Sequence, residues 1–249
     1  MVAIVSTPFT VTAILRQGVA FDQHHGVAFD GLVAGILRNN GCDIGLGQRP
    51  SVMDKGLAAD TPTDWMLPFG ECSYPAYQDR HWLVTTGLLL DRAGNPYKPA
   101  PDVHRLLNVV NTPRLETVAG VVPAQVSPLR GRYRNKLTPV VFYPCAAIQW
   151  RGVGFVDEIR KLVENVPAIG SRRGSGEGAV ARWSVVGHSE VDDPIRFAHT
   201  HVDGMPGRGY PQECFVQCGF PTGVIGVGGI RPPLFHKERQ RQLMFVARR

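Results

Sequence analysis

No stretch of this 249-residue chain approaches the roughly 18 consecutive apolar residues that a membrane-spanning helix needs. Cysteine is also scarce: five scattered thiols are too few for a disulfide framework, and an odd number is typical of a reducing compartment. The first residues lack the basic and then apolar succession of a secretory signal. We therefore expect a cytoplasmic protein with no membrane partner.

Several catalytic and nucleotide-binding patterns are missing as well. The sequence has no GxSxG nucleophile elbow, no HExxH pair and no Walker-type GK[ST] ending. Acidic residues are the scarcer charged class, with 21 Asp and Glu against 27 Lys and Arg, and the net charge of +6 favours anionic partners such as nucleic acid. Hydrophobic residues make up 43% of the chain, which is enough for a packed core.

Hydrophobic periodicity predicts a mixed α+β fold. The expected elements are strands at 9–16, 116–126, 137–150 and 179–186 and helices at 28–38 and 155–166. In chain order they give β-α-β-β-α-β, so we expect a ferredoxin-like core within residues 1–187. A long insertion, about residues 39–111, follows the first helix, because Gly, Pro, Asp and Asn interrupt the pattern there. We expect an irregular C-terminal extension, residues 188–249, to pack on the core.

A glycine-rich loop between the second helix and the last strand carries the clearest binding signal. Its glycines alternate with arginine and serine at Gly170, Ser171, Arg172, Arg173, Gly174, Ser175, Gly176 and Gly178. Glycines leave backbone N–H groups unobstructed and the guanidinium groups flank them, a combination that suits phosphate. The same composition also fits a plain flexible connection. A dinucleotide-binding loop is disfavoured, because there the glycines follow a strand and open a helix.

A second basic segment lies between the two middle strands. It carries Arg130, Arg132, Arg134 and Lys136 with no acidic residue. These side chains could contact phosphate, or they could form an ordinary solvated charge run. Nearby aromatic residues such as Trp150 would stack on unpaired bases if they faced the open side of the sheet, or pack in the core if they did not.

Four stretches of the chain form a recognisable pattern. They are FTVTAILRQGVAFDQHHGVAFDGLVAGIL at 9–37, TPVVFY at 138–143, AIGSRRGSGEGAVARWSV at 168–185 and GGIRPPLF at 228–235. Together they resemble the CRISPR-associated RAMP superfamily, and within it the small RAMP subunit of type IV effector complexes. In that family a glycine-rich loop lies along the RNA, and the residues here that match this loop are Gly170, Arg172, Arg173, Gly174, Gly176 and Gly178.

This resemblance implies an RRM-like fold and a non-catalytic subunit that holds the 5′ handle of a guide RNA, the crRNA, without a cofactor. It also implies docking to backbone RAMP subunits and a large subunit of the effector complex, with target DNA contacted indirectly. In related guide-processing endoribonucleases a histidine soon after the first strand acts as general base on the 2′-hydroxyl. His24 and His25 occupy that region, so a metal-independent endoribonuclease is the alternative.

Two further patterns bear on metal binding. His199, His201 and Asp203 match part of the HxHxDH motif of metallo-β-lactamase-like hydrolases, but glycine follows the aspartate where that motif has histidine. Cys214 and Cys218 would need Cys72 or a histidine to complete a zinc site, and no second cysteine pair is present. The sequence therefore favours a polar loop and reduced cysteines, and predicts no metal.

Overall fold

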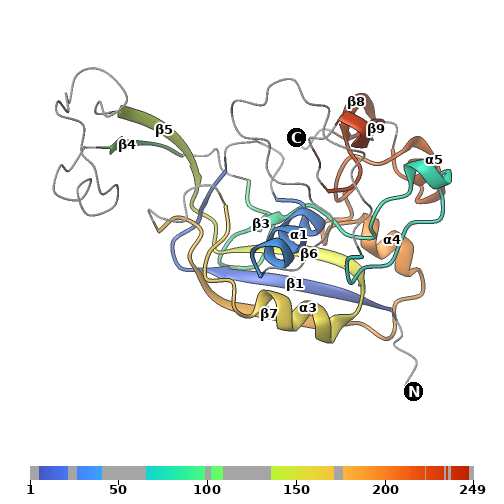
Figure 1. Ribbon diagram of the computed structural model, residues 1–249, viewed down its shortest axis with the longest axis horizontal. Helices are drawn as coiled ribbons and strands as arrows, with labels where there is room; N and C mark the ends of the chain where they lie inside the picture. Colours follow the sequence, from blue (N-terminus) through green and yellow to red (C-terminus); the bar gives the residue numbers. More distant parts are fainter. Residues whose placement is uncertain are drawn as a thin grey trace.

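The described part of the chain is a mixed α+β protein whose strands all pair antiparallel (Figure 1). In this computed structural model it comprises residues 6–21, 27–40, 66–98, 102–108, 136–170, 176–221, 223–232, 234 and 237–246. The expected α+β class is confirmed. Within these residues, no helix has an apolar stretch long enough to cross a bilayer.

The largest sheet has four strands in the order β3-β6-β1-β7. Their bounds are β1 Thr7–Leu15, β3 Leu88–Leu90, β6 Ala147–Gly154 and β7 Val180–Gly187. The first strand lies in the centre, and its alternation of threonine with apolar residues explains why. Phe9, Val11 and Ala13 are fully buried on one face, whereas Thr10 and Thr12 lie half-buried on the other.

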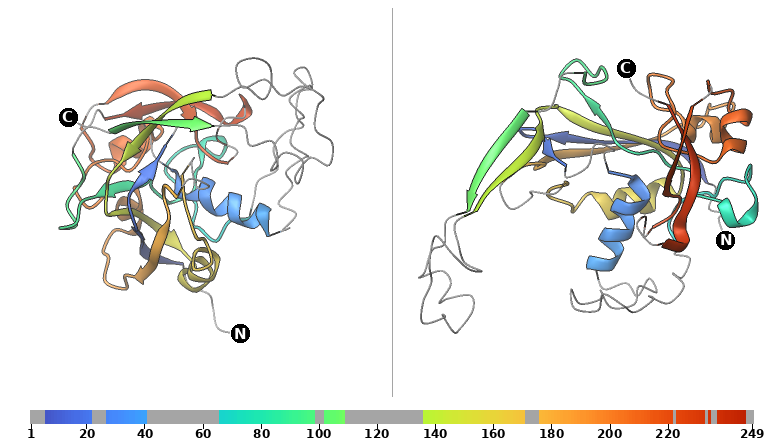
Figure 2. Two further views of the ribbon diagram at one scale, coloured as in Figure 1. Left: turned by 90° about the vertical axis from the view of Figure 1, so that its left-hand side faces the viewer. Right: turned by 90° about the horizontal axis from the view of Figure 1, so that it is seen from above.

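Two helices cover the apolar face of this sheet. They are α1, Phe29–Asn39, and α3, Val156–Val163, and Figure 2 shows both on the same side of the strands. Phe29 from α1 and Ile159 from α3 are fully buried in the same cluster as Phe9. The helices and strands thus share one hydrophobic core, which leaves the opposite face of the sheet for other contacts.

The predicted strand 137–150 is in fact two strands in different sheets. β5, Lys136–Tyr143, pairs with β2, Val19–Ala20, and β4, Asp102–Asn108, in a three-stranded sheet that extends away from the core (Figure 1). The break falls at Pro144, which has no N–H to donate, and the Cys145 N–H turns back to the Tyr143 carbonyl at 2.8 Å. β6 then starts at Ala147 in the four-stranded sheet.

The strand next to β6 also differs from expectation. It is β3, which lies inside the range assigned to the insertion and pairs with β6 through Leu88, Leu89 and Leu90. Residues 116–126, the predicted strand, lie outside the described residues. The run of three leucines is too short to stand out as a strand, so only the pairing identifies it.

The C-terminal extension is more regular than its loop-like sequence predicts. It contains α4, Pro194–His199, α5, Gln212–Gln217, and an antiparallel pair, β8, Val224–Gly229, with β9, Gln240–Phe245. Single-turn 3-10 helices lie at Tyr77–Asp79 and Lys237–Arg239. The Asp193 carboxylate caps α4 by accepting from the Arg196 N–H at 2.9 Å, and Pro194 follows the cap. A helix of one or two turns has too few residues for a visible apolar stripe.

A buried ion pair joins the extension to the core. The Arg208 guanidinium lies 3.1 Å from the Asp30 carboxylate in the first turn of α1, with side chains 5% and 0% exposed. Arg208 also donates to the carbonyls of Gly229 and Ile230 at the end of β8. One side chain therefore ties α1 to the β8–β9 pair.

Candidate functional site

The glycine-rich loop has a narrow, hydrogen-bonded base. Ala168 bridges Ala179, and the Ile169 N–H donates to the Gly178 carbonyl at 2.9 Å. Gly170, Gly176 and Gly178 have φ of 91°, 91° and 74°, a region that favours glycine. The rest of the predicted RNA-binding loop, Ser171, Arg172, Arg173, Gly174 and Ser175, lies outside the described residues.

Two of these glycines are required by close packing as well as by φ. A side chain at Gly178 would overlap the Ile169 carbonyl, and one at Gly170 would approach the Ala20 carbonyl to 2.6 Å. The Gly178 N–H donates to the Gly18 carbonyl at 2.7 Å, and the Arg16 N–H donates to Ala179 at 2.9 Å. The loop base is therefore fixed against the turn that follows β1.

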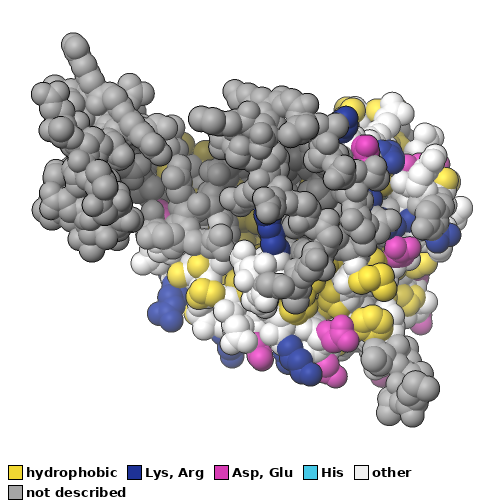
Figure 3. Space-filling model, in the orientation of Figure 1, with side chains coloured by type: hydrophobic (Ala, Val, Ile, Leu, Met, Phe, Trp, Pro, Cys, Tyr) yellow, Lys and Arg dark blue, Asp and Glu magenta, His cyan; other side chains and the backbone are white. Residues whose placement is uncertain are grey.

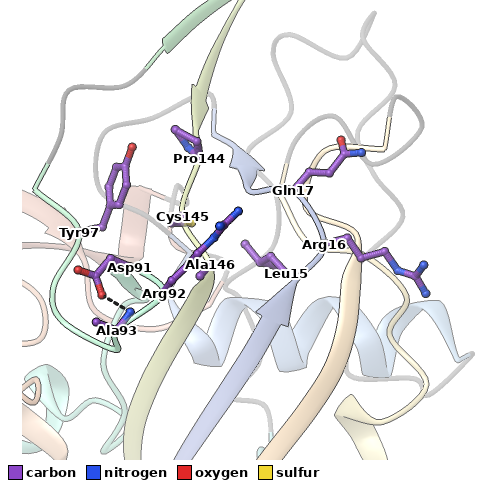
Figure 4. A pocket seen from close by; sticks show the side chains of 10 residues that line it. All are labelled: Leu15, Arg16, Gln17, Asp91, Arg92, Ala93, Tyr97, Pro144, Cys145 and Ala146. Carbon is purple, nitrogen blue, oxygen red and sulfur yellow. Dashed lines mark hydrogen bonds between the residues drawn. The ribbon is translucent and has the colours of Figure 1, made fainter.

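A cleft of about 820 Å³ opens beside the same turn (Figure 4). Its walls are the end of β1, the turn after β3 and the β5–β6 connection, with lining residues Leu15, Arg16, Gln17, Asp91, Arg92, Ala93, Tyr97, Pro144, Cys145 and Ala146. Figure 4 shows Arg92 reaching into the opening between Tyr97 and Leu15, whereas Arg16 points outward.

The acidic residue of the cleft, Asp91, already accepts hydrogen bonds from the backbone of its own turn. The Asp91 carboxylate accepts from the N–H groups of Ala93 and Asn95, both at 2.9 Å. Burial raises the pKa of the Cys145 thiol to about 12, so this thiol stays protonated at neutral pH. The cleft thus offers a guanidinium and a phenol ring to a ligand, and its thiol is a poor nucleophile.

The face of the main sheet opposite the helices is polar and partly covered. Near α4, the Arg151 guanidinium lies 4.7 Å from the Phe197 ring centre and donates to the His201 carbonyl at 3.2 Å. Over β7 the face bears Arg182 and Ser184, which pair with Ile14 and Thr12. Of these two residues, Arg182 is exposed and Ser184 is half-buried.

Trp150 does not face that side. Its side chain is fully buried beneath α1, with its ring centre 5.4 Å from that of Phe29, and its indole N–H donates to the Val27 carbonyl at 2.8 Å. Base stacking by Trp150 is therefore wrong as a hypothesis: the alternation that makes β6 a strand places this ring on the core side.

Most of the other residues that the sequence suggested for RNA binding or catalysis lie outside the part of the chain that the structure describes. His24, His25, Arg130, Arg132 and Arg134 lie outside the described residues, and Lys136 is described only as the first residue of β5. On the described part of the face in Figure 3, Lys and Arg side chains are interspersed with Asp and Glu. A strongly basic surface is thus not visible from that direction.

The structure brings together four side chains that the sequence connected only in part, since it weighed Cys214 and Cys218 with Cys72 or a histidine and favoured reduced cysteines. Cys72, His81, His199 and Cys214 are all buried, and their sulfur and nitrogen atoms lie within 4.8 Å of one another. The two sulfur atoms are 3.7 Å apart, and the two Nε2 atoms are 3.0 Å apart. His199 and His201 were expected at a polar strand or loop edge; His201 lies in a turn, but His199 ends α4, and the two residues are only 0% and 3% exposed.

Burial and mutual contacts set the protonation of this cluster. The hydrogen bond from Cys214 lowers the pKa of the Cys72 thiol, and the same contact raises the pKa of Cys214. Burial lowers the pKa of His81, which favours the neutral imidazole. A thiolate beside a neutral imidazole is the protonation state that binds a soft divalent metal.

The sequence signal for this cluster was weak. Zinc motifs are recognised by close pairs such as C-x₂-C, whereas here Cys72 and His81 lie far apart within the 66–87 segment and α4 and α5 supply one side chain each. Cys218, which the sequence paired with Cys214, is buried but does not belong to the four. A search with protein-family models finds no match to this chain, and a comparison with curated proteins finds no similar sequence.

Proposed function

We propose that this chain is a guide-RNA-binding subunit of a type IV CRISPR ribonucleoprotein, which holds the 5′ handle of the crRNA and docks to backbone and large subunits. Its core is a ferredoxin-like RAMP unit, and its role is binding rather than catalysis. The observation that carries this proposal is the fixed base of the glycine-rich loop against the turn after β1.

The topology supports the ferredoxin-like assignment. The elements β1, α1, β3, β6, α3 and β7 come in the chain order β-α-β-β-α-β, with β2 inserted before α1 and β4 and β5 inserted between β3 and β6. The first strand lies between the third and the last, the second is at the edge, and both helices cover one face. A β-α-β-β-α-β chain gives this arrangement when each helix returns over the same face of an antiparallel sheet.

The loop supports phosphate binding. Arg172 and Arg173 lie in the chain between Gly170 and Gly176, whose backbones are described on the two sides of the loop. A loop whose two ends are fixed loses less entropy when it contacts a phosphate backbone. Guanidinium groups and free backbone N–H groups together are the usual partners of phosphate oxygens.

The adjoining cleft extends this surface. Gly18, whose carbonyl accepts from Gly178, directly follows the cleft residues Arg16 and Gln17, so loop and cleft share one turn. Within the cleft, Arg92 is suited to a phosphate and Tyr97 to stacking on an unpaired base. A single RNA strand that lay along the loop would therefore meet a second set of contacts.

Binding of a fluorescent single-stranded guide RNA, followed by anisotropy at several salt concentrations, tests the proposal. The double variant R172E/R173E should bind at least about tenfold more weakly, and its salt dependence should be shallower because fewer counterions are released. R92E should weaken binding as well. The control is R38E, which makes the same single Arg→Glu change as R92E at an exposed position in the last turn of α1. Equal affinity of R172E/R173E, R38E and the unaltered chain would overturn the assignment of the loop.

A further inference from the structure

The four clustered Cys and His side chains come from two parts of the chain that are distant in sequence. Cys72 and His81 lie on paired backbone segments before β3, where the Cys72 N–H donates to the His81 carbonyl at 2.8 Å. His199 ends α4, and Cys214 lies in α5. The cluster is thus where the segment before β3 meets the C-terminal extension.

The sulfur–sulfur distance matches that around a tetrahedral zinc ion, and the nitrogen–nitrogen distance is a few tenths of an ångström shorter. With Zn–S bonds of about 2.3 Å and Zn–N bonds of about 2.0–2.1 Å, two sulfur ligands lie about 3.8 Å apart and two nitrogen ligands about 3.3–3.4 Å apart. The observed separations are 3.7 Å for the Cys72 and Cys214 sulfurs and 3.0 Å for the His81 and His199 Nε2 atoms. A disulfide would need a separation of about 2.05 Å, so the two thiols are free.

The His199 imidazole is oriented as metal-bound imidazoles usually are. The His199 Nδ1 lies 2.6 Å from the Ile195 carbonyl oxygen. Because a carbonyl only accepts, Nδ1 carries the proton, and the Nε2 lone pair points toward the other three residues. His81 Nδ1 is buried without a hydrogen-bond partner among the described residues. A metal ion bound at Nε2 would leave this Nδ1 unpaired, so only His199 has the supporting hydrogen bond that is usual for a metal-bound imidazole.

The surroundings exclude water and leave no position for a substrate. All four side chains are buried, and the fully buried Tyr210 ring lies 4.4 Å from the His199 ring and 5.2 Å from the His81 ring, between centres. Two thiolates would neutralise a divalent cation, which makes its burial among apolar residues acceptable. Four protein ligands complete a tetrahedral shell, and closed sites of this kind are structural.

We propose that Cys72, His81, His199 and Cys214 form a structural zinc site that fastens the C-terminal extension to the segment before β3. The ion would crosslink α4 and α5 to that segment. It would add to the apolar contacts of the surrounding hydrophobic core, in which Leu83 and Phe215 lie with Cys72 and Cys214. The site is independent of RNA binding, so it stands or falls separately from the proposed function.

Metal analysis of the full chain, purified under reducing conditions from zinc-supplemented cells, tests this proposal. We expect one zinc ion per chain by inductively coupled plasma mass spectrometry. C72S and C214S should each lower the zinc content at least about tenfold, because each removes a thiolate ligand. C145S, which removes an equally buried thiol outside the cluster, should retain full zinc content.

Replacement of zinc by Co²⁺ in the unaltered chain gives a readout that does not depend on how the variants fold. We expect the intense visible absorption of tetrahedral Co²⁺ together with a thiolate-to-cobalt charge-transfer band. Folded, reduced protein that holds less than about a tenth of an equivalent of zinc and develops no thiolate–cobalt band would overturn the proposal. So would a Cys72–Cys214 disulfide found by mass spectrometry in protein alkylated at the moment of lysis.

Discussion

Gly178 and Gly176 share a left-handed backbone conformation but have very different surroundings. An added methyl group at Gly178 would overlap the Ile169 carbonyl, whereas one at Gly176 would meet nothing within 4 Å. G178A should therefore lower the free energy of unfolding by at least about 3 kcal/mol, against about 1–2 kcal/mol for G176A, which bears only the cost of its φ. Urea denaturation measures both values. Equal losses would show that the base of the loop is not closely packed.

The buried ion pair of Asp30 with Arg208 should contribute more to stability than the exposed pair of Asp157 with Arg160. D30N leaves the Arg208 guanidinium, 5% exposed, without its counter-charge, and should cost about 3–5 kcal/mol of stability. D157N breaks the Asp157–Arg160 pair, whose side chains are 82% and 49% exposed, and should cost less than about 1 kcal/mol. Thermal or urea unfolding of the two variants gives the difference. A D30N loss as small as that of D157N would contradict the burial of this pair.

The burial of the Cys145 thiol predicts that the free energy of unfolding depends on pH. Burial raises its pKa from 9.0 to about 12, so between these values the folded chain retains a proton that the unfolded chain releases. Its contribution to stability is therefore complete below pH 9 and is lost as the pH rises toward 12. The unfolding free energy of the unaltered chain should fall more steeply over this window than that of C145S. Parallel pH curves would contradict this prediction.

At the scale of secondary structure elements, the proposed zinc site predicts which parts of the chain its removal loosens. After chelation, backbone amides in α4, in α5 and in residues 70–84 should exchange with deuterium faster, because the ion no longer joins them. α3 packs on the opposite face of the main sheet from α4 and should be unaffected. Hydrogen exchange followed by peptide mass spectrometry measures this. An unchanged or uniform response would contradict a local structural role.

Long periodic elements were the ones that the sequence could predict. α1 and α3 were expected within a few residues of their observed ends, as were β1 and β7, because each has enough residues to display its period. The α+β class follows from these four elements together. Thr10 and Thr12 illustrate the signal, since they mark the half-buried side of a strand whose other side is the core.

Short elements and long-range contacts escaped prediction for physical reasons. β3 has three residues and is a strand only because β6 pairs with it, and α5 has six residues and no full apolar stripe. The cluster of Cys72, His81, His199 and Cys214 depends on tertiary packing that no local pattern encodes. The sequence located the loop glycines, but the carbonyl groups that make Gly170 and Gly178 necessary came only from the structure.

At the scale of the whole molecule, the two proposed sites lie in different parts of the fold. The glycine-rich loop and the cleft lie next to each other at the end of β1, close to where the three-stranded sheet leaves the core (Figure 1). The zinc cluster involves α4 and α5, in the extension that follows β7. The cleft with the loop base and the Cys–His cluster are therefore two separate features of the fold, and the proposed RNA binding concerns only the first.

The most direct test is to co-express the chain with its genomic neighbours and a CRISPR array, purify it, and sequence the ends of the bound RNA. The account predicts that discrete guides with a common 5′ handle copurify, that R172E/R173E loses them, and that H24A/H25A leaves their ends unchanged. Uncut precursor in the histidine variant would instead make this chain the processing endoribonuclease. Purification of the unaltered chain without RNA would contradict the central claim.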